Sequence, residues 1–330
     1  MNSKPLLGTM FSRLCACALG LSFAFALASP LQAQEYPSGP VTIIVPYAPG
    51  GATDNLARVV ANQLSEIWGK PVLVENKPGA NGIVGAGVVA NAKPDGQTLL
   101  LVVPGHLMNP NLFANSPYDV LKDFTPITQI ATSPWLVVAN NQVAASNLKE
   151  LIALAKAQPG KLAFGSSEPS TWLAGKFFEQ LAGVELLNVP YKGASTVVTD
   201  LLGNNIQLMF TTPLSVSSYL SSGKLRALAV ASSTRMASLP DIPTAAEAGL
   251  RGYESGAWYG LYGPARMSEK ITNQIQQGVA QVLSEPQTRD RLLATGATAV
   301  GSSSQTFAEF TASEFSKYQK LIRDAKIEPQ

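Results

Sequence analysis

The chain has 330 residues, of which 46% are hydrophobic and 14% are charged. This composition excludes an intrinsically disordered chain and favours a globular protein, and the length has room for two domains. The formal net charge is only +2, so we expect no nucleic-acid partner, because such a partner needs a strong basic field.

The first 33 residues have the pattern of a secretory signal peptide. Positive residues precede a short apolar run, 14–28, and the segment Leu31-Gln-Ala33 fits a cleavage site. A membrane anchor is the alternative, but a span needs about 20 apolar residues and this run is shorter. Cys15 and Cys17 both lie in this segment, so the exported protein would carry no thiol or disulfide. The sequence therefore predicts a periplasmic protein.

A strand, a glycine turn and a helix start follow one another in residues 41–54. Val41 to Val45 form an apolar, β-branched run, which is typical of a strand covered on both faces. The turn Pro49-Gly50-Gly51 cannot continue the strand, and Thr53 or Asp54 can cap the following helix. Such a turn directs backbone N–H groups and the positive end of a helix dipole at one point, so it predicts an anion site.

Strands and helices alternate along the next part of the chain, which predicts an α/β fold with parallel sheets and helices on their faces. Residues 104–126 have the irregular, Asn- and Pro-rich pattern of a crossover, and the chain becomes looser from Asp241 to Pro264. The final helical stretches, 268–325, would pack back onto the first sheet. The chain would then cross twice between two lobes, and these crossings would form a hinge. The strands expected in these lobes are 41–45, 71–75, 97–103, 135–139, 161–165, 185–191, 206–211 and 225–231.

The ends of the expected strands share one chemical character. Ligands of parallel-sheet folds bind at the carboxyl ends of strands, and here those ends are rich in Gly, Ser, Thr and Asn, with Lys77 and Lys192 as their only Lys or Arg residues. An acidic ligand would therefore be held by backbone N–H groups, hydroxyls and waters. Each turn alone is ordinary for an α/β protein, but six such turns favour a binding cleft. They are 46–54, 76–82, 104–106, 165–171, 190–195 and 211–213.

Several side chains in these turns have both a functional and a structural interpretation. Asp54 either caps its helix or accepts hydrogen bonds from a ligand or an ordered water. Tyr47, Tyr191 and Trp172 either line the cleft or pack in the core. Glu168 would repel an anion unless it pairs with a cationic part of the ligand, and its alternative role is that of a solvated loop residue.

Enzymatic interpretations have little support in the sequence. His106 is the only histidine, which excludes a multi-histidine metal site and leaves one base for a Ser-His-Asp triad. The G-x-S-x-G elbow, the P-loop and the dinucleotide G-x-G-x-x-G pattern are all absent. We expect no enzyme, no metal and no cofactor, and a periplasmic hydrolase using a serine with His106 is the alternative.

Short motifs occur in an order and spacing that together are highly specific. On these motifs the sequence resembles the periplasmic substrate-binding proteins of tripartite tricarboxylate transporters, the Bug family, over essentially the whole exported chain. The motifs include Val45-Pro-Tyr-Ala-Pro-Gly-Gly51 with Asp54, Val74-Glu-Asn-Lys-Pro-Gly-Ala80 with Gly82, Lys93-Pro-Asp-Gly96, Gln158-Pro-Gly-Lys161, Gly165-Ser-Ser167, Val189-Pro-Tyr-Lys-Gly193, Leu239-Pro-Asp-Ile-Pro-Thr244 and Trp258-Tyr-Gly260.

The resemblance implies a two-lobed Venus flytrap fold that closes on a small carboxylate and delivers it, as a monomer, to a membrane permease. It implies one domain made of 34–133 with 256–330, and a second made of 134–255. The first strand and turn would receive a carboxylate through backbone groups and ordered waters, and the turns at Asn81-Gly82, Ser166-Ser167 and Tyr191-Gly193 would complete the cleft. The expected ligand-binding residues are Tyr47, Ala48, Gly50, Gly51, Asp54, Asn81, Gly82, Ser166, Ser167, Glu168, Trp172, Tyr191, Gly193, Ala194 and Thr211.

The sequence departs from the family pattern at one turn. The family usually continues Gly-Ser-Ser with Gly-x-Gly and often a histidine, whereas this chain has Glu168-Pro169, and Trp172 stands where the histidine often lies. We therefore expect selectivity to depend on Glu168 and Trp172 more than on Asp54. A ligand carrying an amine and an aromatic carboxylate are both open, and a receptor serving a sensor system would use the same cleft.

Overall fold

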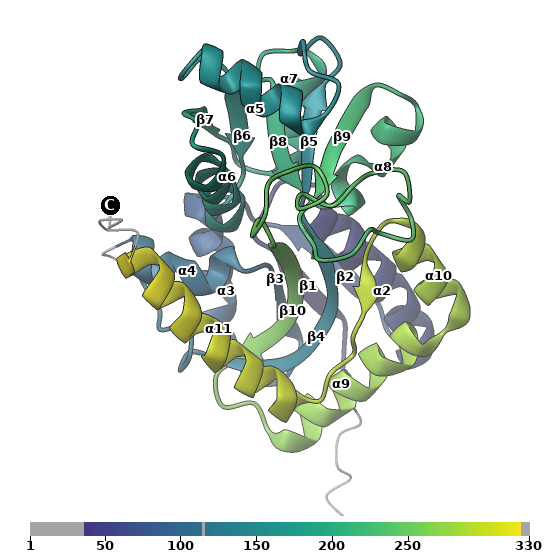
Figure 1. Ribbon diagram of the computed structural model, residues 1–330. Coiled ribbons are helices and arrows are strands. Elements are labelled where there is room, and N and C mark those ends of the chain that lie inside the picture. The colour runs from purple at the N-terminus through teal and green to yellow at the C-terminus, as the bar shows by residue number, and fades with distance from the viewer. Residues whose placement is uncertain (1–35, 114–115, 325–330) are drawn as a thin grey trace, which may run out of the picture. The chain divides into compact units, whose positions relative to one another are not determined.

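The computed structural model describes residues 36–113 and 116–324 (Figure 1). The expected signal peptide, 1–33, lies outside the described residues. By contact density the chain divides into one unit of residues 1–38 and another of residues 39–330, and the fold described below is that of the second unit.

The first sheet has six strands within the described residues, in the order β11-β4-β10-β3-β1-β2. Strand β1 is parallel to β2 and β3, whereas β10 is antiparallel to β3 and β4, and β11 is antiparallel to β4. The strands are β1 (Val41–Val45), β2 (Val72–Asn76), β3 (Thr98–Val102), β4 (Phe124–Pro134), β10 (Gly256–Pro264) and β11 (Thr298–Ala299).

The expectation of a purely parallel sheet is wrong, because the chain returns to this sheet through β10. Strand β10 and helix α4 (Gly105–Leu112) lie in stretches that the sequence indicated were irregular or loose, and β4, which begins at the end of the stretch 104–126, was not among the expected strands. The glycines of β10 weaken the strand pattern, yet they are needed for packing: a methyl group at Gly260 would overlap the ring of Phe307, and one at Gly263 would overlap the sulfur of Met267.

The second sheet is also mixed, and its five strands in the described part of the chain have the order β7-β6-β8-β5-β9. Strand β6 is parallel to β7 and β8, whereas β5 is antiparallel to β8 and β9. Every one of these strands lies within a few residues of its expected position. They are β5 (Leu136–Asn140), β6 (Ala163–Ser166), β7 (Leu187–Pro190), β8 (Leu208–Thr211) and β9 (Leu225–Val230).

Helices cover both sheets. Helices α9 and α11 contact β4, which confirms that the helical tail packs onto the first sheet. We call each sheet together with the helices that pack on it the first lobe and the second lobe. The remaining elements are α2 (Ala52–Trp68), the short helix η1 (Ala80–Gly82), α3 (Ile83–Ala90), α5 (Leu148–Ala157), α6 (Pro169–Ala182), α7 (Ala194–Leu202), α8 (Pro213–Ser221), α9 (Glu269–Ser284), α10 (Pro286–Ala294) and α11 (Ser304–Asp324).

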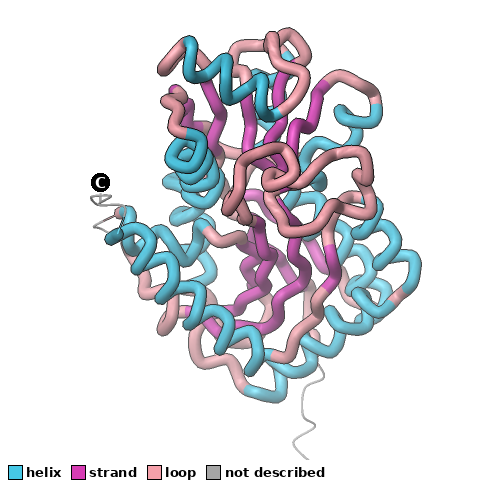
Figure 2. The backbone as a smooth tube through the Cα atoms, in the orientation of Figure 1, coloured by secondary structure: helices cyan, strands magenta, loops and turns pink. Residues whose placement is uncertain are grey.

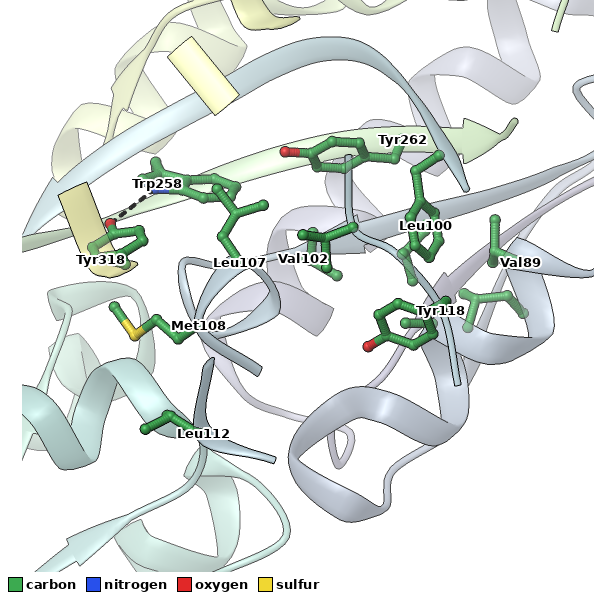
Figure 3. Close-up of a cluster of buried hydrophobic side chains, with 14 of the residues drawn as sticks. Val89, Leu100, Val102, Leu107, Met108, Leu112, Tyr118, Trp258, Tyr262 and Tyr318 are labelled. Atoms are coloured by element: carbon green, nitrogen blue, oxygen red, sulfur yellow. Dashed lines mark hydrogen bonds between the residues drawn. The ribbon is translucent and has the colours of Figure 1, made fainter. Parts of the chain in front are cut away.

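A buried cluster holds the first lobe together. Figure 3 shows Leu107 and Met108 of α4 beside Val102 of β3 and Trp258 of β10. The indole N–H of Trp258 donates a hydrogen bond of 3.3 Å to the hydroxyl of Tyr318 in α11. Burial of such aromatic side chains stabilises the fold by roughly 1.5–3 kcal/mol each, and it fixes the position of α4 relative to the sheet.

The chain passes between the lobes next to Trp135 and again after the loop 231–255, which is drawn in pink at the centre of Figure 2. The backbone N–H of Trp135 donates to the carbonyl of Ser255 at 3.0 Å, and Ala231 N–H donates to the carbonyl of Trp135 at 2.8 Å. These bonds tie the two crossing segments to each other. The exact domain limits of 134 and 255 stay a prediction.

Candidate functional site

Two turns from different lobes face each other at very short range. A methyl group placed on Gly193, before α7, would lie 2.5 Å from Cβ and 2.8 Å from the backbone nitrogen of Ala48, which follows β1. One placed on Gly51 would lie 3.5 Å from Cβ of Ala194. The backbone of Gly193 is extended, with φ of 176°, so glycine is needed here for the close approach and not for its conformation.

Helices α2 and α7 begin at these two turns. Gly51 and Gly193 occupy the N-cap positions, and neither helix receives a hydrogen bond from a capping side chain in the described part of the chain. The first N–H groups of any α-helix lack partners inside the helix. The expectation that Thr53 or Asp54 caps α2 is therefore wrong, because the helix begins at Ala52 and both residues lie inside it. Two uncapped, positive helix ends thus meet at one place.

A cavity lies at this meeting point and has a volume of about 40 Å³, which is room for a few water-sized groups. Both lobes line it, which brings together many of the residues expected from the sequence. Among the side chains that line it, none is a Lys or Arg in the described residues. The lining consists of Tyr47, Ala48, Gly51, Ala52, Thr53, Asp54, Val103, Trp135, Ser167, Glu168, Thr171, Ala194, Thr211, Thr212, Ser215, Ala257 and Tyr259.

The carboxylate of Asp54 lines the cavity but is already occupied by its own chain. It accepts the backbone N–H of Gly50 at 2.9 Å, two N–H groups of Arg58 at 3.0 and 2.9 Å, and the amide of Asn76 at 3.0 Å. Burial opposes its ionisation, but these hydrogen bonds outweigh burial and lower the pKa of Asp54. Asp54 is therefore an ionised group with its own counter-charge, and it braces the glycine turn.

Glu168 is buried, so the alternative of a solvated loop residue is wrong. It is the N-cap of α6, where its carboxylate accepts the backbone N–H groups of Ser170 at 2.9 Å and Thr171 at 3.1 Å. The backbone of Gly105, at the start of α4 in the first lobe, also hydrogen-bonds this carboxylate. Burial raises the pKa of Glu168, and these hydrogen bonds oppose the rise.

The remaining expected residues lie beside this cavity or away from it. A second cavity, of about 270 Å³, is lined by Tyr47, Asn81, Gly82, Ser167 and Tyr191 together with neighbouring residues. The hydroxyl of Tyr191 donates to Asp200 at 2.6 Å. Neither cavity is lined by Gly50, Ser166, Trp172 or Gly193 in the described residues.

Trp172 packs against the buried cluster of the first lobe, although it belongs to α6. This placement gives it a packing role, and its role as a ligand contact stays a prediction. Ser166 is the last residue of β6, and its carbonyl accepts the N–H of Tyr191. Both residues therefore support the positions of the lining turns.

The cavity wall also includes residues that the sequence analysis missed. Val103 follows β3, Trp135 lies at a crossing between the lobes, and Tyr259 lies in β10. The hydroxyls of Tyr259 and Thr212 are hydrogen-bonded at 2.9 Å, and this contact joins the first lobe to the second. Tyr259 lies within the motif Trp258-Tyr-Gly260, but neither it nor Trp135 follows an expected strand end, since the antiparallel strand β10 and the crossing segment bring them to the cavity.

His106 does not line the cavity. Its ring is buried among Tyr118, Phe124 and Tyr262, and the Phe124 ring is 4.9 Å away edge to face. Within the described residues its Nε2 atom has no hydrogen-bond partner. Burial lowers the pKa of His106 to about 3, so the ring is neutral at physiological pH. The hydrolase alternative therefore lacks the base that it requires in the cavity.

Comparison with known proteins agrees with this architecture. The model of the "Tripartite tricarboxylate transporter family receptor" family matches residues 56–327. Protein BugT of Bordetella pertussis is 33% identical over 311 residues, which cover 93% of this chain and 95% of that protein.

Solved structures give the same result at the level of the fold. The periplasmic binding protein BugD is 32% identical and superposes with a TM-score of 0.85, covering 89% of this chain and 100% of its own. A protein of R. palustris solved with adipate is 31% identical, with a TM-score of 0.86 and coverage of 90% and 100%. These matches confirm the two-lobed α/β fold, and the chain belongs to the tripartite tricarboxylate transporter receptor family.

Proposed function

We propose that this protein is an extracytoplasmic receptor that captures a small carboxylate in the cavity between its lobes and delivers it to membrane permease subunits. The observation that carries the proposal is the meeting of two uncapped helix ends, α2 and α7, at one cavity. Oriented N–H groups and helix dipoles bind anions without a cationic side chain.

The charges around the cavity favour recognition by the backbone. Asp54 is neutralised by Arg58, and the hydroxyls of Thr53, Ser167 and Thr211 line the cavity. A carboxylate placed between the helix ends would accept hydrogen bonds from N–H groups and hydroxyls that are already oriented. Such a site binds and releases a ligand without chemical change, so we propose no catalytic role.

Relatives supply the class of ligand. One R. palustris protein of this fold was solved with adipate, and another, called MatC, with malate; the second is 30% identical and has a TM-score of 0.83. Both ligands are small carboxylates. We extend only this class to the present chain, together with export by the signal peptide, a monomeric state and domains divided near 134 and 255.

A thermal-shift screen tests the proposal. The purified exported chain would be heated with aliphatic monocarboxylates, dicarboxylates, tricarboxylates, aromatic acids and amino acids, with sodium chloride as the ionic-strength control. A ligand present at 100 times its Kd stabilises the folded state by about 2.7 kcal/mol, which gives a clear rise in Tm. If no carboxylate raises Tm above the salt control, the protein is not a carboxylate receptor.

A further inference from the structure

Glu168 places a carboxylate of the protein itself inside the ligand cavity. Its side chain lines the cavity and is buried. Besides the N–H groups of Ser170 and Thr171, the Ser170 hydroxyl donates to it, and so does the Gly105 backbone of the other lobe. Burial raises the pKa of Glu168, and these donors oppose the rise because they favour the ionised form of the carboxylate.

Glu168 differs from the other acidic side chain in the cavity wall. Asp54 forms an ion pair with Arg58 at 2.9 Å, whereas every hydrogen-bond donor described for Glu168 is an uncharged N–H or hydroxyl group. The negative charge of Glu168 is therefore not cancelled by a side-chain cation in the described residues. Burial raises the pKa values of Tyr47 and Tyr259, and the nearby charge of Glu168 adds to the rise.

The N-terminus of α6 thus already holds an anion, while those of α2 and α7 hold none from a capping side chain of the described chain. Glu168 lines the same cavity as these two helix ends, so a second carboxylate of a ligand bound between them would lie close to Glu168. Two carboxylates at such range in a buried site repel each other strongly, since little water screens them.

We propose that Glu168 determines specificity by excluding a second ligand carboxylate, so that this receptor binds short monocarboxylates in preference to dicarboxylates of equal length. This inference rests on the proposed function. It separates the chain from its relatives solved with adipate and malate, both of which carry two carboxylates. The far end of the ligand would be apolar, or would donate a hydrogen bond toward Glu168.

A purely structural role for Glu168 is the competing explanation. The side chain completes a capping box with Thr171, and a cap contributes about as much stability whether or not a ligand is near. This explanation predicts that removing the charge changes Tm but leaves the preference between ligands unchanged. The ratio of two affinities therefore distinguishes the explanations, whereas stability alone does not.

The test measures Kd by calorimetry for two matched pairs, pentanoate with glutarate and hexanoate with adipate, at one ionic strength and pH 7.5. For the wild-type chain we expect each monocarboxylate to bind at least about tenfold more tightly than its matched dicarboxylate. Glu168→Gln keeps a hydrogen-bond acceptor but loses the charge. In this variant we expect the Kd of the dicarboxylate divided by the Kd of the matched monocarboxylate to fall at least about threefold. A tenfold ratio corresponds to about 1.4 kcal/mol.

Glu179→Gln is the matched control. Glu179 lies on the same helix and is largely buried, but it pairs with Lys176 at 2.7 Å and does not line the cavity. We expect this variant to lose stability and to keep the wild-type ratio of affinities.

The outcomes separate this inference from the proposed function. Wild-type protein that binds glutarate or adipate as tightly as the matched monocarboxylate overturns the inference and leaves carboxylate reception intact. An unchanged ratio in Glu168→Gln overturns it as well. If neither series binds but another carboxylate of the thermal-shift screen does, the inference fails and the proposed function stands; if no carboxylate binds at all, both fail. Should Glu168→Gln not fold, the wild-type ratio alone decides.

Discussion

The Asp54 carboxylate connects three parts of the first lobe at the edge of the cavity. It binds the Gly50 backbone in the turn, Arg58 one helical turn further on, and Asn76 at the end of β2. Because the side chain is buried, loss of the acceptor would leave several donors without a partner. A residue with this set of contacts keeps the turn in the shape that directs its N–H groups at the cavity.

We therefore expect Asp54→Asn to reduce the free energy of unfolding by about 2 kcal/mol at pH 7, since hydrogen bonds from charged groups are lost. The pKa of Asp54 is lowered in the folded state, so its contribution is complete above the usual pKa of about 3.9 and disappears as pH falls through the lower, folded-state value. Urea denaturation at pH 7 and at pH 3 would measure both effects.

Asp290→Asn is the control for this variant, because Asp290 is exposed on α10. We expect its stability to match the wild-type chain within about 0.5 kcal/mol at both pH values. Equal losses in Asp54→Asn and Asp290→Asn would show that Asp54 has no special structural role.

At the scale of elements, the site depends on two helix starts that approach each other without side chains between them. Gly193 lies against Ala48, and Gly51 lies against Ala194. A methyl group at Gly193 would have to separate the two turns. The extended backbone of Gly193 accepts alanine without strain. The substitution would therefore act by keeping the two lobes further apart.

Gly193→Ala should therefore weaken carboxylate binding by about 1–3 kcal/mol, which corresponds to a Kd roughly 5- to 150-fold higher. Gly87→Ala is the matched control, because a methyl group there meets nothing within 4 Å and the residue lies in α3. Calorimetric titration of both variants with the best ligand of the thermal-shift screen would measure the difference. Unchanged affinity in Gly193→Ala would mean that ligand binding does not require this contact.

At the scale of the whole chain, a few polar contacts join the lobes directly. Tyr259 of β10 is hydrogen-bonded to Thr212 at the start of α8, and Gly105 of α4 to Glu168 of the second lobe. Each contact exists only while the lobes are together. The free energy of these contacts therefore adds to that of ligand binding.

Tyr259→Phe removes the hydrogen bond to Thr212 between the lobes, which is 2.9 Å long. Tyr262→Phe is the control, because it removes a hydrogen bond of the same length, to Thr311, within the first lobe. We expect each variant to lose about 1 kcal/mol of stability. Only Tyr259→Phe should also bind ligand more weakly and release it faster, as stopped-flow dissociation would measure. Equal release rates in the two variants would contradict a role for the contact between lobes.

The sequence predicts this fold well where local pattern and topology agree. Strand β1 and the helices after the Gly50 and Lys192 turns follow from apolar runs that end at glycine. Strand β10 could not be predicted in the same way, since Gly260 accommodates Phe307 from a distant part of the chain. Local patterns cannot contain the position of a side chain that arrives much later in the sequence.

Some residues of the cavity wall can be predicted from the sequence and others cannot. The predictable ones lie in turns that follow strands, and they are Tyr47, Ala48, Gly51, Ser167, Glu168 and Ala194. Trp135 and Tyr259 are not, because the crossing segment and an antiparallel strand bring them there. Trp172 shows the opposite case: its position beside Glu168 in the sequence suggests a cavity contact, but the helix turns it toward the first-lobe cluster.

Trp135 has one further consequence, since it belongs both to the cavity wall and to the junction of the crossing segments. Because its backbone is bonded to both Ala231 and Ser255, we expect the two crossings to bend together as a single hinge between the lobes. For a receptor whose binding-competent form is the closed one, the apparent Kd equals the intrinsic Kd divided by the closed fraction. Substitutions at this junction would tune affinity for every ligand by the same factor and leave the ranking of ligands unchanged.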